Sequence, residues 1–191
     1  LFIGGLLQNI GQIGQDVIGQ DGQEGDPQCS QYNDVQYGDE FAPRSWLRAE
    51  QQLTASPLGA DGEFNPAFID QVGQFAGSSL IARMVEAGGW GNRELFGVIH
   101  GSGMVSQVLW GGESGANLGD AYVWGRTMPA LGFHTEGRNR GGAFSFSETD
   151  RIAARQFPQL VIGEDGTPRM LYRGRTHTFR NISHPTHGEG C

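Results

Sequence analysis

The sequence predicts an α+β sandwich, in which a mixed β-sheet is flanked by helices. Three observations indicate it: a long stretch with apolar residues at helical spacing, three apolar strand-like stretches after it, and then a short helix followed by a hairpin. This order is that of a fold in which helices cover one sheet. The expected elements are helices at 43–53 and 65–86, strands at 95–100, 104–110 and 128–134, a helix at 148–156, and a hairpin of 160–162 with 170–172.

The two N-terminal helices are predicted from their apolar spacing. The first turns Trp46, Leu47 and Leu53 inward. The second opens at Asn65-Pro66 and carries an apolar stripe that we assign to the core. Gly77-Ser78-Ser79 can break or kink this helix, and Gly88-Gly89-Trp90-Gly91 is predicted as a turn. The stripe consists of Phe68, Val72, Phe75, Leu80, Ile81 and Met84.

The strands follow this helix and are separated by glycine-rich segments. A loop at 111–119 joins the second and third strands. The hairpin turns at Glu164-Asp165-Gly166, because Asp-Gly supplies the positive φ that such turns often need. His100 lies in the first strand and is expected to face the core.

Composition divides the 191 residues into one domain and two flanking segments. We predict a Gly/Gln-rich extension or linker at 1–40, a globular domain at 41–180 and a C-terminal tail at 181–191. The extension has helically spaced apolar residues, yet glycines interrupt them and its many glutamines are unsuited to lipid. No run of eighteen apolar residues exists, so no membrane span is expected.

The net charge of the chain limits the classes of partner that it can bind. A formal net charge of −8 argues against binding nucleic acid through its phosphates. The thirteen basic residues are all arginine, which reflects either GC-rich codons or a chain without lysine side chains for ubiquitination. Arg138 and Arg140 lie close in sequence to the site discussed next, and four more arginines gather toward the C-terminus. Cys29 and Cys191 are too few for a disulfide framework, and whether they pair stays open.

The most informative stretch runs from His134 to Asp150. Glu136 follows His134 by two residues, and Ser147 precedes Asp150 by three. Imidazole nitrogen and carboxylate oxygen are ligands that zinc accepts while leaving a position for water. Without a metal, Ser147 is simply the N-cap of a helix with acidic residues in its first turn, and His134 belongs to a surface loop.

Glu94 begins the strand at 95–100 and completes a longer pattern. The order of a glutamate, an apolar strand, His134-Thr135-Glu136-Gly137 and Ser147-Glu148-Thr149-Asp150 resembles that of JAMM (MPN-plus, RadC-like) metallopeptidases. The resemblance covers roughly residues 80–173. It implies the JAMM/cytidine-deaminase-like form of the sandwich.

Carried over position by position, the resemblance implies a single zinc ion held by His134, Glu136 and Asp150. Glu94 would be the general base, and Ser147 would stabilise the oxyanion of the tetrahedral intermediate. The chain departs from the family at Glu136, where a second histidine is expected. A carboxylate can bind zinc, but it adds one negative charge, which should make the activated water less acidic.

The resemblance implies a metal-dependent peptidase or isopeptidase that hydrolyses an amide bond of a protein substrate. Glu136 motivates an alternative, a catalytically impaired JAMM-like binding module within a larger secreted or shell-forming protein. A second metal site is conceivable at His184, His187 and Cys191, although a tail with proline and glycine is more often disordered.

The first residues carry a second resemblance. Leu1-Phe2-Ile3-Gly4-Gly5 would fit the junction after which Rhs-type polymorphic toxins carry a variable C-terminal toxin tip, and JAMM-like domains occur among such tips. This resemblance implies a toxin or effector domain that is secreted or delivered into a target cell. It also implies a parent Rhs-like shell, a chaperone or an immunity protein as partners.

Overall fold

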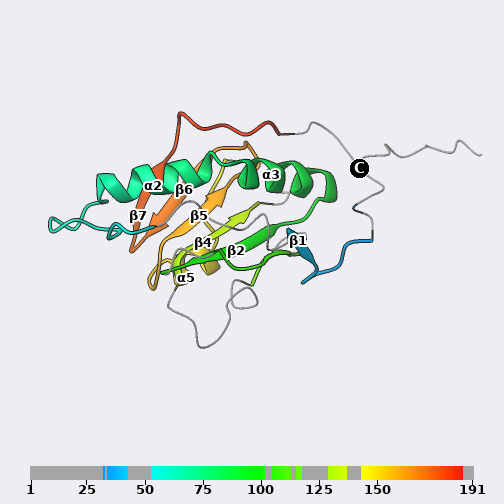
Figure 1. Cartoon of the computed structure of the whole chain (residues 1–191), viewed down its shortest axis with the longest axis horizontal. Coiled ribbons are helices and arrows are strands. Elements are labelled where there is room, and N and C mark those ends of the chain that lie inside the picture. Colours follow the sequence, from blue (N-terminus) through cyan, green and yellow to red (C-terminus); the bar gives the residue numbers. More distant parts are fainter. Residues whose placement is uncertain are drawn as a thin grey trace, which may run out of the picture.

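A seven-stranded mixed β-sheet forms the centre of the structure, in the order β1-β3-β2-β4-β5-β6-β7 (Figure 1). The computed structural model describes residues 32, 34–42, 53–101, 105–112, 115–117, 129–136 and 143–186. The strands are β1 Glu40–Ala42, β2 Leu95–His100, β3 Val108–Trp110, β4 Pro129–Thr135, β5 Gln159–Ile162, β6 Pro168–Tyr172 and β7 Arg175–Thr178, and the helices are α2 Pro66–Ala76, α3 Ser79–Gly91 and α5 Glu148–Ala153.

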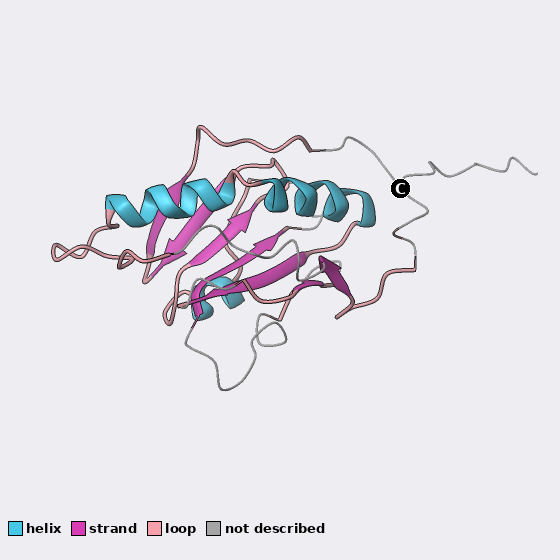
Figure 2. Ribbon diagram, in the orientation of Figure 1, coloured by secondary structure: helices cyan, strands magenta, loops and turns pink. Residues whose placement is uncertain are grey.

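The helices α2 and α3 cover one face of the sheet, and α5 lies on the other (Figure 2). The expected break between α2 and α3 is confirmed. Asn65 caps α2, its side chain accepting a hydrogen bond from the Ala67 N–H, and Ser78 caps α3 directly after α2 ends. The predicted turn at Gly88-Gly89-Trp90-Gly91 is wrong, because these residues form the last turn of α3.

The core lies between the sheet and these two helices. Alternate residues of the strands point toward the helices, as the period of two in a strand requires. Gly97 of β2 is needed there, because a Cβ atom would lie 2.6 Å from the Phe133 ring of β4. The main core residues on the sheet are Leu95, Ile99, Leu131, Phe133, Leu160 and Ile162, and those on the helices are Phe68, Val72, Phe75, Ile81 and Met84.

The opposite face of the sheet carries the other set of alternate residues. Phe96 and His134 face each other across the antiparallel pair of β2 and β4. His100 is buried, with 1% of its surface exposed. The strands β4 and β5 are parallel, and α5 provides the crossover between them. The end of β4 and the start of α5 therefore belong to one β–α–β unit.

Several predicted elements have the expected bounds and others differ. The strand at 95–100 is confirmed, and the hairpin of β5 and β6 turns through Gly166, whose φ is +71°. The predicted strand at 104–110 is wrong in length, because the regular strand begins at Val108. The helix predicted to reach residue 156 ends at Ala153. The edge strands β1 and β7 were not predicted.

The segments on either side of the domain make contacts that the sequence did not indicate. Tyr32 and Val35 pack against the core, and β1 begins at Glu40, so this part of the predicted extension belongs with the folded body. His184 is 7% exposed and its Nε2 atom lies 2.7 Å from the Ala76 carbonyl oxygen. The expectation of a disordered tail is therefore wrong for the segment up to residue 186.

Some predictions fall outside the described residues. They include nearly all of the helix at 43–53, the extension up to residue 31, Arg138, Arg140, His187 and both cysteines. Within the described part of the chain, none of the helices combines the length and the apolar character needed to cross a membrane.

Candidate metal centre

The end of β4 places two potential ligands on the same face of the sheet. His134 and Glu136 are two residues apart, so their side chains point the same way, opposite to Thr135. The Glu136 N–H donates to the Ile162 carbonyl of β5, which continues the strand geometry to this residue. Both side chains therefore lie on the face that α5 covers.

Asp150 reaches this face from the first turn of α5. The helix begins with a capping box, in which the Ser147 hydroxyl accepts from the Asp150 N–H and the Asp150 carboxylate accepts from the Ser147 N–H. The Ser147 hydroxyl also donates to Asp150 Oδ2 at 2.7 Å. These bonds fix the orientation of a carboxylate whose side chain is 8% exposed.

The segment before α5 is anchored to the β5–β6 hairpin. The Arg169 guanidinium lies 4.3 Å from the centre of the Phe144 ring, and Phe144 packs edge-on against Phe146. Arg169 also binds Asp165 in the hairpin turn, and this guanidinium holds the pKa of Asp165 at about 2. The segment that precedes Ser147 is thus held to the sheet by side-chain contacts.

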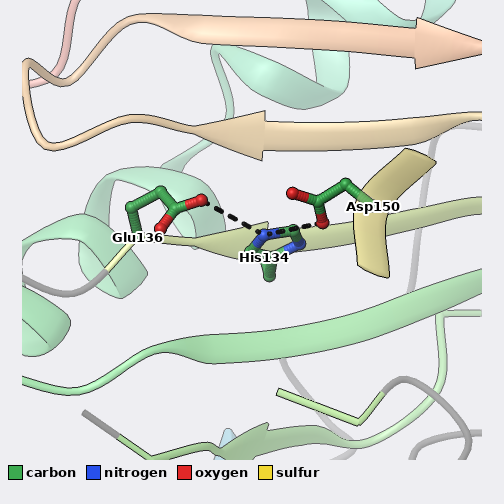
Figure 3. A group of neighbouring side chains, drawn as sticks. All are labelled: His134, Glu136 and Asp150. Carbon is green, nitrogen blue, oxygen red and sulfur yellow. Dashed lines mark ion pairs between the residues drawn. The ribbon is translucent and has the colours of Figure 1, made fainter. Parts of the chain in front are cut away.

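His134, Glu136 and Asp150 converge on one point (Figure 3). His134 Nε2 lies 3.4 Å from Asp150 Oδ1 and 3.7 Å from Glu136 Oε1, and the three side chains are 6–8% exposed. Ligand bonds of about 2.1 Å at tetrahedral angles separate ligand atoms by about 3.4 Å. Potential ligand atoms of all three residues lie within 4.8 Å of one another, so this group could hold a metal ion.

The electrostatics of the group favour a cation. Burial on its own would lower the pKa of His134, but the polar contact with Glu136 and the charges of Asp150, Glu94 and Glu136 outweigh it and raise this pKa above its usual value. At 3.7 Å the contact with Glu136 is an ion-pair attraction rather than a short hydrogen bond. Carboxylates crowded around one buried imidazole thus create a site that attracts positive charge.

Glu94 lies beside this group at the start of β2. Phe96 pairs with His134 in antiparallel register, so the register extended by two residues brings Glu94 opposite Glu136. Glu94 is 4% exposed, and its backbone is held by hydrogen bonds with Gly111 and Gly112. Its charge contributes to the raised pKa of His134. The role of Glu94 as a base stays a prediction.

A small pocket opens at the same end of the sheet. Glu136 and Thr135 line it together with the ends of β5 and α3 and the C-terminal segment. The remaining lining residues are Val85, Gly89, Ile162, Gly163, Glu164 and Thr186.

The structure brings together the three residues expected as ligands, and Ser147 is hydrogen-bonded to one of them, Asp150. The charge of Glu94 acts on His134. The sequence did not reveal the contribution of Thr135, whose Oγ1 atom accepts a hydrogen bond from the Leu95 N–H. The alternative metal site in the tail loses support, because His184 is buried against α2 by its bond to the Ala76 carbonyl.

Comparisons of the chain with protein-family models, with curated protein sequences and with solved structures find no match. The interpretation of the site therefore depends on its own geometry.

Proposed function

We propose that the protein is a metal-dependent peptidase or isopeptidase with a JAMM-like sandwich fold. The observation that carries the proposal is the convergence of His134, Glu136 and Asp150. The charge of Glu94, which helps to raise the pKa of His134, supports it. The placement of these residues supports it further. A glutamate precedes one strand, the histidine lies next to the end of the neighbouring strand, and the aspartate lies in the first turn of the helix that follows.

The donor set fits zinc. One neutral imidazole and two carboxylates balance the charge of a divalent cation, and nitrogen and carboxylate oxygen are ordinary zinc ligands. A bound zinc ion supplies an acidified water molecule and polarises the carbonyl of the substrate. Three protein ligands leave the fourth position open, as catalytic zinc sites do and structural ones do not.

Residues of the chain bind the cation and transfer the proton. His134, Glu136 and Asp150 hold the cation at the end of β4. Glu94 accepts a proton as the water oxygen attacks the carbonyl carbon of the scissile amide. It then gives this proton to the nitrogen as the C–N bond breaks, so that a carboxylic acid and an amine leave the site.

A binding module without chemistry is the second candidate, and Glu136 is the observation that favours it. An inner shell with two carboxylates balances the charge of zinc and so acidifies water less than a shell with two histidines. In that case the same scaffold would bind a protein partner and hydrolyse nothing.

The test is hydrolysis of peptide and isopeptide substrates by purified protein, with and without a zinc chelator. We expect activity that the chelator removes and zinc restores. Glu94→Gln should abolish it while zinc content and melting temperature stay nearly unchanged, because the amide has the same shape but cannot accept the proton. Glu148→Gln removes an exposed charge at the start of α5 and is the control. Activity of Glu94→Gln within about tenfold of the parent would show that Glu94 is not the base.

A further inference from the structure

Ser147 makes more bonds to Asp150 than a helix cap requires. Its N–H donates to Asp150 Oδ2 at 2.8 Å, and its hydroxyl donates to the same oxygen at 2.7 Å. The hydroxyl oxygen also accepts from the Asp150 N–H at 3.1 Å. Both hydrogens that Ser147 can donate are therefore directed at one carboxylate oxygen.

The other oxygen of this carboxylate is directed at the metal centre. Asp150 Oδ1 lies 3.4 Å from His134 Nε2, at the separation of two ligands on one zinc ion. With Oδ2 held by two donors, the carboxylate presents a single oxygen in a fixed orientation. The hydroxyl proton that an oxyanion would need is already used in this arrangement.

We infer that Ser147 is a positioning residue, whose hydroxyl holds Asp150 as a one-oxygen ligand, rather than the donor that stabilises the oxyanion. This inference rests on the proposed function and changes the role that the family resemblance implies for Ser147. Groups that orient a ligand typically change metal affinity by about 10- to 100-fold when they are removed. A group that acts only on the oxyanion leaves metal affinity unchanged.

Helix capping alone is the competing explanation, and the chain offers a matched control for it. Ser78 caps α3 in the same way, its hydroxyl accepting from the Ile81 N–H, but residue 81 has no carboxylate to orient. Ser78→Ala therefore removes a serine cap without touching the metal centre. Glycine is nearly as good an N-cap as serine, so Ser147→Gly removes the hydroxyl with little loss of helix stability.

The experiment measures zinc affinity by competition with a chromophoric chelator, together with melting temperature, for the full chain and four variants. We expect Ser147→Ala and Ser147→Gly to weaken zinc binding equally, by about 10- to 100-fold, although alanine lowers the melting temperature more. Ser147→Thr keeps the hydroxyl and should restore affinity to within about threefold of the parent. Ser78→Ala should lower the melting temperature and leave zinc affinity unchanged.

Two results would overturn the inference in different ways. Zinc affinity of Ser147→Gly within about threefold of the parent overturns the positioning role alone. If hydrolysis falls in that variant at unchanged affinity, the hydroxyl acts on the oxyanion. A parent protein that binds no zinc overturns the metal centre, and the positioning role with it.

Discussion

Glu136 sets the charge of the proposed centre. Its side chain lies 3.7 Å from His134 and is 6% exposed, so it is held inside the group rather than in solvent. With a divalent cation, two carboxylate ligands give a neutral inner shell, whereas an imidazole at position 136 would leave one positive charge. A positive shell lowers the pKa of water more than a neutral one.

We predict that Glu136→His increases hydrolysis by about two- to tenfold, because it makes the activated water more acidic. The measurement is the initial rate on the best peptide substrate at saturating zinc. Glu164→His is the control, since Glu164 lines the same pocket without belonging to the ligand group. Loss of zinc from Glu136→His would instead mean that the carboxylate has a geometry that histidine cannot reproduce.

The side chain of Thr135 connects the start of β2 to the end of β4 through a hydrogen bond. The Leu95 N–H donates to Thr135 Oγ1 at 3.0 Å in a buried setting, and the same threonine separates His134 from Glu136. Gly88 of α3 allows the close approach of these ends, because a Cβ atom there would lie 2.9 Å from the Arg93 carbonyl oxygen and 3.2 Å from Thr135 Oγ1. This hydrogen bond thus keeps Glu94 in register with His134 and Glu136.

We predict that Thr135→Val destabilises the protein by about 1–3 kcal/mol, because it leaves the buried Leu95 N–H without its acceptor. Zinc affinity should fall as well, since the register of the two strand ends loosens. Thr135→Ser keeps the acceptor and should stay within about 1 kcal/mol of the parent. Denaturant unfolding and zinc titration measure the two effects. Equal stability of the valine and serine variants would contradict a stabilising role of the Thr135 hydrogen bond.

The elements that could be predicted are those with strong local signals. Strand 95–100 is an apolar run, and the α2–α3 break carries its own capping residues. The last turn of α3 was missed because glycines disfavour helix locally, and packing against β2 overrides that preference. The short edge strands β1 and β7 have little apolar pattern, and they form because neighbouring strands offer hydrogen-bond partners.

The site was predictable to the extent that it is local in sequence. His134, Glu136 and Asp150 belong to one strand-to-helix connection, and the resemblance to the metallopeptidase pattern implied that they converge. Contacts from distant parts of the chain could not be predicted, because only the tertiary structure brings them together. Thr186 in the pocket wall and the backbone bonds of Gly111 and Gly112 with Glu94 are examples.

At the scale of the whole molecule, the folded body includes Tyr32. Tyr32 packs on Trp110 with ring centres 5.6 Å apart, and the Gly38 N–H donates to the Trp110 carbonyl. Both contacts support the edge of the sheet formed by β3 and β1. A truncation that spares Tyr32 should therefore behave differently from one that removes β1.

We predict that deleting residues 1–31 changes the melting temperature by less than about 5 °C. Deleting residues 1–42 should lower it by more, because it removes β1 and exposes Trp110. Calorimetry of the two truncated proteins beside the full chain makes the comparison. Aggregation of the protein that lacks only residues 1–31 would place part of that segment in the core.

Metal content is the most direct test of the central claim, that His134, Glu136 and Asp150 form a metal centre. Elemental analysis of purified protein, before and after incubation with zinc and removal of the excess, measures it. We expect about one zinc ion per chain, lost in His134→Ala and Asp150→Ala and retained in His177→Ala, whose imidazole packs between Phe64 and Phe179. A folded parent protein that retains no divalent metal, or His134→Ala protein that retains as much as the parent, would contradict the claim.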